Sequence, residues 1–135
     1  MKLLKLNSDK WANVNLSKYK LDWAAKVSSF QRKVQDFLQP FWQNDEMVAE
    51  LPIPGSKLRI DLVNISRKIA VEVSPRQHYN FNEFFNGNRI NFVNSLNRDE
   101  AKRNWIQKMG WKLVELSEDD IKNLKIEMFD EIPNN

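Results

Sequence analysis

Apolar residues first recur at a regular spacing near position 30, after 28 residues in which no period of 2 or 3.6 persists. Five apolar positions then follow the spacing i, i+4, i+7, i+8 and i+11: Phe30, Val34, Phe37, Leu38 and Phe41. This spacing predicts an amphipathic helix that begins near Ser29. Ser28 or Ser29 can cap its first turn, and Pro40 is expected to interrupt its last turn.

Three strand-like runs follow this helix, at about 46–53, 57–63 and 68–73. A Pro-Gly pair marks a turn after the first run. The short polar link 64–67 joins the second and third runs, which are rich in β-branched residues. This link predicts a hairpin, so the two runs should be antiparallel neighbours.

The second half of the chain opens with a segment rich in Asn and Phe and without a clear period, at 74–97. A loop of this length is usually functional or carries a short helix. A helical face returns at 98–109, and Gly110 suits the position after a helix end. A short strand is expected at 111–116, and a capping-box-like start predicts a last helix over 117–129.

The order of these elements predicts an α/β fold, with a mixed central sheet of about four strands flanked by helices. Residues 1–28 are expected to form an irregular N-terminal arm that packs through its aromatic side chains. Residues 29–135 would then form one compact domain. No internal repeat or low-complexity tract interrupts it.

Composition limits the chemistry open to the chain. With no cysteine and one histidine, it cannot form a disulfide framework, a thiolate zinc site or a multi-histidine metal centre. Any metal would be held by oxygen ligands. No apolar run approaches the roughly 18 residues needed to span a bilayer, and the first residues lack the apolar core of a secretory signal. We therefore expect a cytoplasmic protein without a membrane partner.

Charge is distributed unevenly along the chain. The formal net charge is +3, but the residues from Ser117 onward hold six acids and two lysines, so the rest of the chain carries +7. A basic body favours phosphate-bearing partners such as nucleic acid. An excess of this size is also common on ordinary soluble domains.

Two carboxylates in the apolar strands are the most informative residues. If the turn is centred on 64–67, Asp61 lies opposite Ala70, and Glu72 is a diagonal neighbour on the same face, about 7 to 8 Å away. Two carboxylates at that separation can share one divalent cation, which would compensate their burial. Alternatively, Asp61 is a solvated residue on an edge strand, and Glu72 forms a salt bridge with Arg59 or Lys68.

Motifs of moderate specificity follow in a family-like order: Ile60-Asp61, Val71-Glu72-Val73, Gln77-His78, Arg98-Asp99-Glu100-Ala101-Lys102, and Gly110-Trp111 leading into Leu113-Val114-Glu115-Leu116. Their order and spacing, from about residue 28 to 121, resemble the PD-(D/E)xK nuclease superfamily. More narrowly, they are similar to the branch related to very-short-patch repair endonucleases, which includes phage homing endonucleases. The resemblance implies a restriction-endonuclease-like fold and a DNA endonuclease that depends on Mg²⁺ or Mn²⁺.

The resemblance also implies roles for single residues. Asp61 and Glu72 would be metal ligands, with the Val73 carbonyl as a further ligand. His78, paired with Gln77, would be the general acid or base. Asp99 would orient His78 or a water, and four basic side chains are candidates for phosphate contact: Arg76, Arg89, Arg98 and Lys102.

The chain departs from the family pattern at two positions. Gln31 stands where the first helix of the family carries an acid, and Ser74 replaces the lysine of the Glu-x-Lys motif. These departures leave open a catalytically inactive nuclease-fold module that binds nucleic acid or a protein partner. A structural or interaction protein, whose acids serve only salt bridges, is the second alternative. The chain would be a monomer or a homodimer, in the host cytoplasm if phage-encoded.

Overall fold

A four-stranded mixed sheet forms the centre of the molecule. The computed structural model describes residues 1–74 and 89–129, without the side chains of residues 89–96. The sheet order is β3-β4-β5-β6, with antiparallel pairs β3/β4 and β4/β5 and a parallel pair β5/β6. The strands are β3 (Met47–Pro52), β4 (Arg59–Asn64), β5 (Ile69–Val73) and β6 (Lys112–Leu116). The predicted α/β class with a mixed sheet flanked by helices is thereby confirmed.

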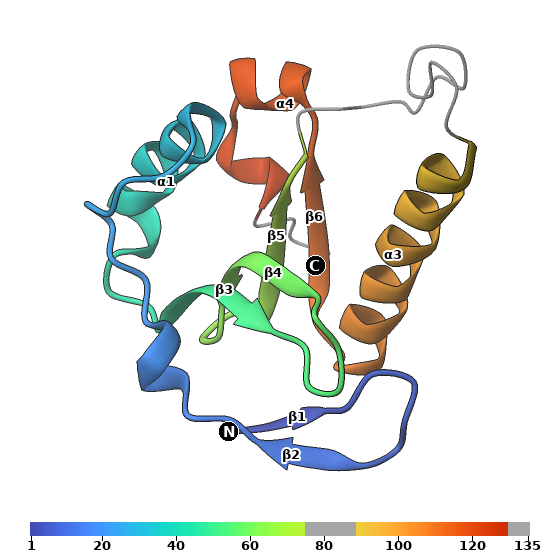
Figure 1. The fold of residues 1–135 in the computed structure, drawn as a ribbon. Helices are drawn as coiled ribbons and strands as arrows, with labels where there is room; N and C mark the ends of the chain where they lie inside the picture. Colours follow the sequence, from blue (N-terminus) through green and yellow to red (C-terminus); the bar gives the residue numbers. More distant parts are fainter. Residues whose placement is uncertain (75–88, 130–135) are drawn as a thin grey trace.

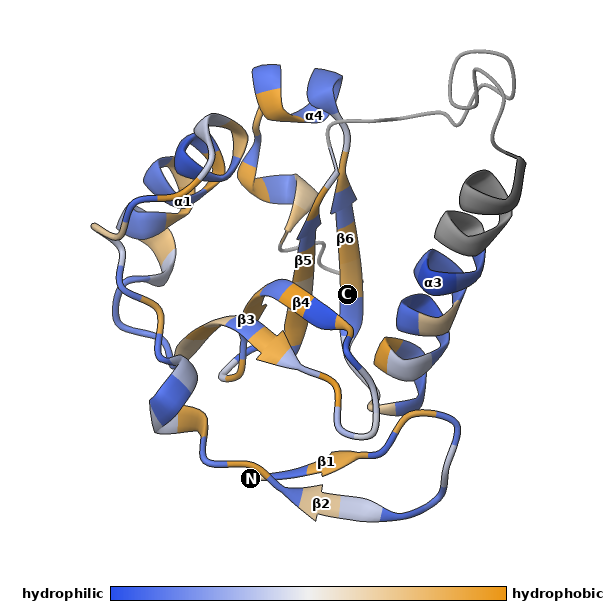
Figure 2. Ribbon diagram, viewed as in Figure 1, coloured by the Kyte–Doolittle hydropathy of each residue, from blue (hydrophilic) through white to orange (hydrophobic). Residues whose placement is uncertain are grey.

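Two helices lie on opposite faces of this sheet, α1 (Ser29–Trp42) on one and α3 (Arg89–Lys108) on the other (Figure 1). Each face carries its own hydrophobic cluster. The α1 cluster includes Val34, Leu38, Trp42, Leu62, Val71, Val114 and Phe129. The α3 cluster includes Leu3, Val63, Ala70, Trp105, Ile106 and Trp111. Because side chains alternate between the faces of a strand, the predominantly hydrophobic strands in Figure 2 supply both clusters.

The N-terminal 28 residues are more regular than predicted. They form the antiparallel pair β1 (Lys2–Leu4) and β2 (Trp11–Asn13), followed by the 3-10 helix η1 (Leu16–Tyr19). Leu3 is fully buried, and the indole Nε1 of Trp105 donates to the Leu4 carbonyl at 2.7 Å. The expectation of an irregular arm was wrong for these residues because strands of three residues are too short to reveal a period.

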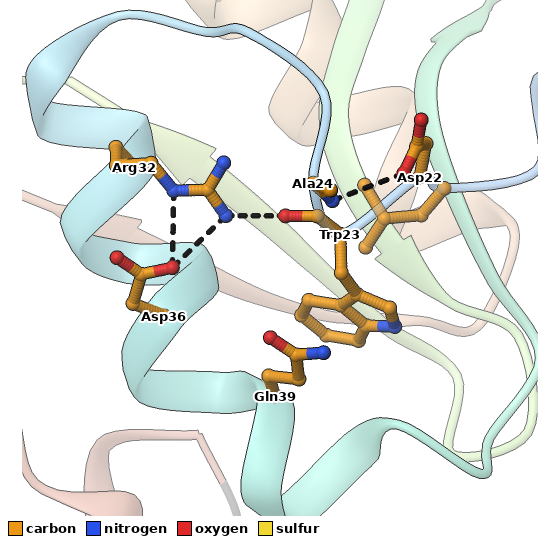
Figure 3. A pocket seen from close by; sticks show the side chains of 7 residues that line it. Asp22, Trp23, Ala24, Arg32, Asp36 and Gln39 are labelled. Carbon is orange, nitrogen blue, oxygen red and sulfur yellow. Dashed lines mark hydrogen bonds and ion pairs between the residues drawn. The ribbon is translucent and has the colours of Figure 1, made fainter.

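The segment before α1 is attached to that helix by one arginine (Figure 3). The guanidinium of Arg32 donates to the carbonyls of Ala25 and Trp23, and it also pairs with Asp36 at 3.0 Å. Trp23, Arg32 and Asp36 line a pocket of about 450 Å³ together with Gln39. Since its cation and its carboxylate already bond each other, this pocket serves to anchor the segment.

Helix α1 confirms the predicted cap, because Ser28 Oγ accepts a hydrogen bond from Gln31 N at 3.2 Å. Pro40 does not interrupt the helix, which continues to Trp42. A proline removes one backbone donor and crowds the preceding turn. The side chain of Trp42, only 1% exposed, holds the last turn in the core despite this cost.

Helix α3 begins at Arg89, nine residues earlier than the expected start at 98. The absence of an apolar period in residues 89–97 hid this part of the helix. Gly110 has a φ of +76° after the helix, as predicted from its position. Within the ranges that the structure covers, no helix is both long and apolar enough to cross a membrane.

The last helix, α4 (Glu118–Lys122), has the predicted capping box between Ser117 and Asp120 but ends seven residues before the expected end at 129. A separate 3-10 turn, η2 (Ile126–Met128), follows. Between them the chain leaves the helical conformation, which brings the ring of Phe129 to within 5.6 Å of the ring of Trp42. Burial of Phe129 therefore decides where the helix stops.

A buried asparagine shifts the turn of the central hairpin by one residue, to 65–68. Asn64 was assigned to the turn, yet it is fully buried at the end of β4 and pairs with Ile69. Its Nδ2 donates to Asp45 Oδ2 at 2.9 Å, and its Oδ1 accepts from Arg67 N at 2.9 Å. The side-chain hydrogen bonds satisfy a polar group that the strand would otherwise bury unpaired.

We expect Asn64→Ala to lower the free energy of unfolding by about 1–3 kcal/mol, since it removes the acceptor of the partly buried Arg67 N–H and one of the donors to Asp45. Urea unfolding followed by circular dichroism measures the change. Asn123→Ala is the matched control, because Asn123 is exposed and its Nδ2 donates only to the Asp119 carbonyl. An equal loss in both variants would contradict the special role of the buried amide.

Candidate functional site

The register of the central hairpin places the two predicted carboxylates side by side. Leu62 pairs with Val71, Val63 with Ala70 and Asn64 with Ile69, so the next positions in register are Asp61 and Glu72. The predicted register, with Asp61 opposite Ala70, was wrong by two residues. Because a strand repeats every two residues, a shift of two leaves both carboxylates on the same face.

Each carboxylate bonds the backbone of the opposite strand. Asp61 Oδ2 accepts from Val73 N at 2.8 Å, and Glu72 Oε2 accepts from Asp61 N at 2.9 Å. The regular pairing of β4 with β5 ends one position earlier, at Leu62 and Val71. The carboxylates thus take the place of backbone carbonyls at this end of the hairpin, and these bonds orient both side chains.

Lys102 reaches the same site from α3. Its Nζ lies 2.8 Å from Glu72 Oε1, and the two side chains are only 21% and 14% exposed. The alternative partners considered for Glu72 were wrong: Arg59 donates to the Glu50 carbonyl at 3.4 Å, and Lys68 lies in the hairpin turn. The folded chain therefore places the ammonium group of Lys102 beside the two acids, although Lys102 lies 30 residues after Glu72 in the sequence.

The electrostatics of the site favour protonation of its acids. Burial is the main cause that raises the pKa of Glu72, and the charge of Asp61 raises it further, against the lowering effect of Lys102. Burial also raises the pKa of Asp61, although the Val73 N–H and the charge of Lys102 act in the opposite direction. Additional positive charge would therefore be stabilised between these carboxylates.

Glu50 is a third acid near the site, and sequence reasoning missed it. It lies between the pairs Ala49 with Leu62 and Leu51 with Ile60, which places it beside Asp61. Its charge raises the pKa of Asp61. Its backbone has a φ of +52°, in the left-handed region that such residues rarely adopt. Only the register of β3 against β4 could have revealed it.

The acid pair fits a magnesium ion in donor chemistry. Asp61 Oδ1 accepts no hydrogen bond in the described part of the chain, whereas both oxygens of Glu72 are engaged. The N–H and C=O of one residue in a strand point toward the same neighbour, so the Val73 carbonyl is directed to the side of Asp61. Mg²⁺ commonly binds one or two carboxylates and keeps several waters.

A larger acidic cluster is absent from the regions that the structure covers. No group of three or more His, Asp or Glu residues there is arranged to hold a metal ion. A cation at Glu72 Oε1 would share or replace the contact with Lys102. The geometry therefore suits a cation held by few protein ligands.

The other predicted residues are placed as follows. Gln31 Nε2 donates to Gln35 Oε1 at 3.0 Å, and within residues 1–74 and 97–129 Gln31 forms no hydrogen bond with Asp61 or Glu72. Arg98 is exposed and Asp99 half-buried on α3, with Asp99 three residues before Lys102. Arg89 begins α3, but its side chain lies outside the described residues, as do all atoms of Arg76, Gln77 and His78. Their predicted roles stay predictions.

The comparisons with known proteins identify a viral relative. Over 80 residues, or 59% of the chain, the sequence is 36% identical to uncharacterized protein 033L of Invertebrate iridescent virus 3. The matched segment spans 41% of that viral protein, so the chain corresponds to less than half of its length. No protein family matches the chain, and no solved structure does.

Proposed function

We propose that the chain is a metal-dependent nuclease of the PD-(D/E)xK superfamily, with a restriction-endonuclease-like fold, that hydrolyses phosphodiester bonds in DNA. The order α1, β3, β4, β5, α3, β6 supports this proposal, together with the parallel placement of β6 on β5. The resemblance to very-short-patch repair and phage homing endonucleases, noted in the sequence motifs, narrows the proposal to that branch.

One observation carries the proposal: Asp61 and Glu72 are adjacent, mostly buried and oriented by backbone N–H groups of the opposite strand, Glu72 by that of Asp61 and Asp61 by that of Val73. Burial of two like charges is unfavourable unless cations compensate it. A fold that needed these residues only for stability would gain by replacing one of them with an amide. The acid pair therefore supports the proposal of a site that binds cations.

In the proposed mechanism, Asp61 Oδ1 and Glu72 would hold Mg²⁺ or Mn²⁺, with the Val73 carbonyl as a further ligand. When bound, the ion would polarise the scissile phosphate and acidify a water. Lys102 balances the charge of Glu72 and fixes the orientation of its carboxylate. His78 is proposed as the general acid or base, assisted by Gln77.

Lys102 also bears on the second departure from the family pattern, the missing strand lysine. The Glu-x-Lys lysine is replaced by Ser74, but Lys102 presents its ammonium group to Glu72 from the neighbouring helix. We propose that Lys102 supplies the positive charge that the strand lacks. An ammonium group there would also stabilise negative charge that develops on the phosphate in the transition state.

A second candidate is a catalytically inactive module of the same fold that binds nucleic acid or a protein. The observation in its favour is that Lys102 already pairs with Glu72, while Gln31 brings no charge. A purely structural role would predict a basic partner for both acids. Asp61 instead accepts from a backbone N–H, and its Oδ1 accepts no hydrogen bond from the described residues.

Plasmid cleavage distinguishes these candidates. We expect the parent chain to convert supercoiled DNA to nicked or linear DNA with Mg²⁺ or Mn²⁺, and EDTA to abolish the conversion. His78→Ala should lower the rate by about 10²-fold or more, the usual range for general acid–base catalysis. Arg103→Met is the control, since the side chain of Arg103 is half-exposed and pairs with Glu115, which lies outside the proposed site.

Two outcomes would contradict a metal-dependent nuclease. DNA binding without cleavage under any metal would support the inactive module. Equal cleavage in EDTA would contradict a metal-dependent mechanism. Unchanged cleavage in His78→Ala would exclude His78 as the general acid or base and would leave the proposed roles of the other residues unaffected.

A further inference from the structure

A second hollow lies on the α1 side of the sheet, between the segment 18–28, the first half of α1 and β3. Its volume is about 550 Å³, several times that of a phosphate group. Three lysines line it: Lys18, Lys20 and Lys26. The lining also contains the polar side chains of Gln31 and Gln35 and the acids Asp22 and Glu50.

Gln35 brings an unsatisfied donor to this pocket. The residue is fully buried, its Oε1 accepts from Gln31 Nε2 at 3.0 Å, and its Nε2 has no hydrogen-bond partner among the described residues. Buried side-chain donors are nearly always paired in folded proteins. The group that would satisfy Gln35 Nε2 must be an acceptor.

The surroundings of Gln35 favour an acceptor that carries negative charge. Ser28 caps the start of α1 at the pocket, and the first turn of this 14-residue helix holds no acid, so its partial positive charge is not offset there. Lys18, Lys20 and Lys26 are exposed and form no ion pair with any described residue. Asp22 is already engaged, because its Oδ1 accepts from Ala24 N at 3.0 Å.

The pocket adjoins the acid pair through Glu50. This residue lines the pocket and lies beside Asp61 in the register of β3 with β4. Glu50 is thus the residue that the pocket and the neighbourhood of the acid pair have in common. The arrangement therefore suits a polymer of regularly spaced anions more closely than a single free ion.

We propose that this pocket binds a backbone phosphate of the nucleic-acid strand, next to the phosphate at Asp61 and Glu72. The Gln35 amide donates to a phosphate oxygen, and Lys18, Lys20 and Lys26 supply the positive charge. This inference rests on the proposed function, since it names the part of the substrate held beside the acid pair.

The test is fluorescence anisotropy of a labelled 20-base-pair DNA duplex with the full chain in EDTA, where no cleavage is expected. The double variant Lys20→Gln/Lys26→Gln should weaken binding about tenfold. The slope of the logarithm of the binding constant against the logarithm of the salt concentration should become less steep by about 1 per lysine. Gln35→Glu should weaken binding at least as much, because it places an anion where a donor faced the phosphate. Lys122→Gln/Lys125→Gln, on the α4 to η2 segment, is the matched control and should bind as the parent does.

The lysine variant keeps the proposal testable if Gln35→Glu does not fold, because both lysines are exposed. Equal affinity in the parent and the lysine variant overturns the proposal. Stabilisation of the parent by inorganic phosphate in a thermal melt, without DNA binding, also overturns it in favour of a free-phosphate site. Tight binding without cleavage in any metal leaves this inference standing and removes only the proposed nuclease activity.

Discussion

Replacing Asp61 by Asn is expected to abolish metal-dependent cleavage and to leave the fold at least as stable as before. The amide keeps an oxygen that can accept from Val73 N but loses the negative charge that would hold a cation. We expect cleavage to fall by about 10³-fold or more, as when one member of a catalytic unit is removed. Single-turnover plasmid cleavage in Mg²⁺ measures the loss.

The stability of the same variant follows from the raised pKa of Asp61. An acid whose pKa is higher in the folded chain binds its proton more tightly when folded. Its contribution to stability is fully present below the ordinary pKa of 3.8 and is lost as pH rises through the raised pKa. At neutral pH the charged Asp61 therefore lowers stability, and Asn should raise it by about 1 kcal/mol, or roughly 3–5 °C in Tm.

Asp36→Asn is the control for both measurements, because Asp36 forms an exposed helical pair with Arg32 and its side chain is 62% exposed. We expect a change in stability below about 1 kcal/mol and unchanged cleavage. A stability loss in Asp61→Asn, with the same pH dependence as the parent, would show that Asp61 serves the fold and not a cation site.

Replacing Lys102 by Met should produce the largest loss of stability at the site. It removes the ammonium group 2.8 Å from Glu72 and leaves two adjacent acids mostly buried. Loss of one partner from a fully buried pair costs about 3–5 kcal/mol, and the partial exposure here reduces the expected loss to about 1–3 kcal/mol. Urea unfolding measures it, and cleavage should also fall by about 10²-fold.

The pH dependence of the Lys102 variant gives a further check with a defined sign. Without the ammonium group the pKa values of Asp61 and Glu72 should rise further, since Lys102 lowers both. The stability loss should then be largest near neutral pH and shrink as pH falls toward 4 and the acids take up protons.

A second substitution and a matched control separate the contribution of the Lys102–Glu72 ion pair from other effects of the Lys102 variant. Adding Glu72→Gln to Lys102→Met should recover part of the lost stability, and the double-mutant cycle gives the coupling energy. Arg103→Met breaks the exposed pair with Glu115, whose side chains are 50% and 42% exposed, and should cost under about 1 kcal/mol. Equal losses in the two single variants would contradict a special role for Lys102.

Local signals predicted most of the elements, and their failures have specific causes. Ser28, Gly110 and the Ser117 to Asp120 capping box act within one helical turn, so they could be identified from neighbouring residues. Asn64 misled the turn assignment because asparagine is typical of turns. Here its amide bonds Asp45, 19 residues away in sequence, and that contact keeps it in the strand.

In the candidate site, too, the features set by neighbouring residues were predicted, and those set by contacts between distant segments were not. The alternation of apolar and polar residues placed Asp61 and Glu72 on one face, and this survived a register error of two because strands repeat every two residues. The distance between the carboxylates depended on the register itself. Glu50 lies beside Asp61 only because β3 pairs with β4 in this register.

By itself, the sequence determined the α/β class, the hairpin that carries the two acids, and the oxygen-only character of any metal site, because these follow from periodicity and composition. The tertiary structure alone decided that Lys102 neutralises Glu72 and that Gln35 is buried with no partner for its amide nitrogen among the described residues. The physical reason is that ion pairs and burial depend on which helix face meets which strand. That packing joins residues 30 positions apart, beyond the reach of any local pattern.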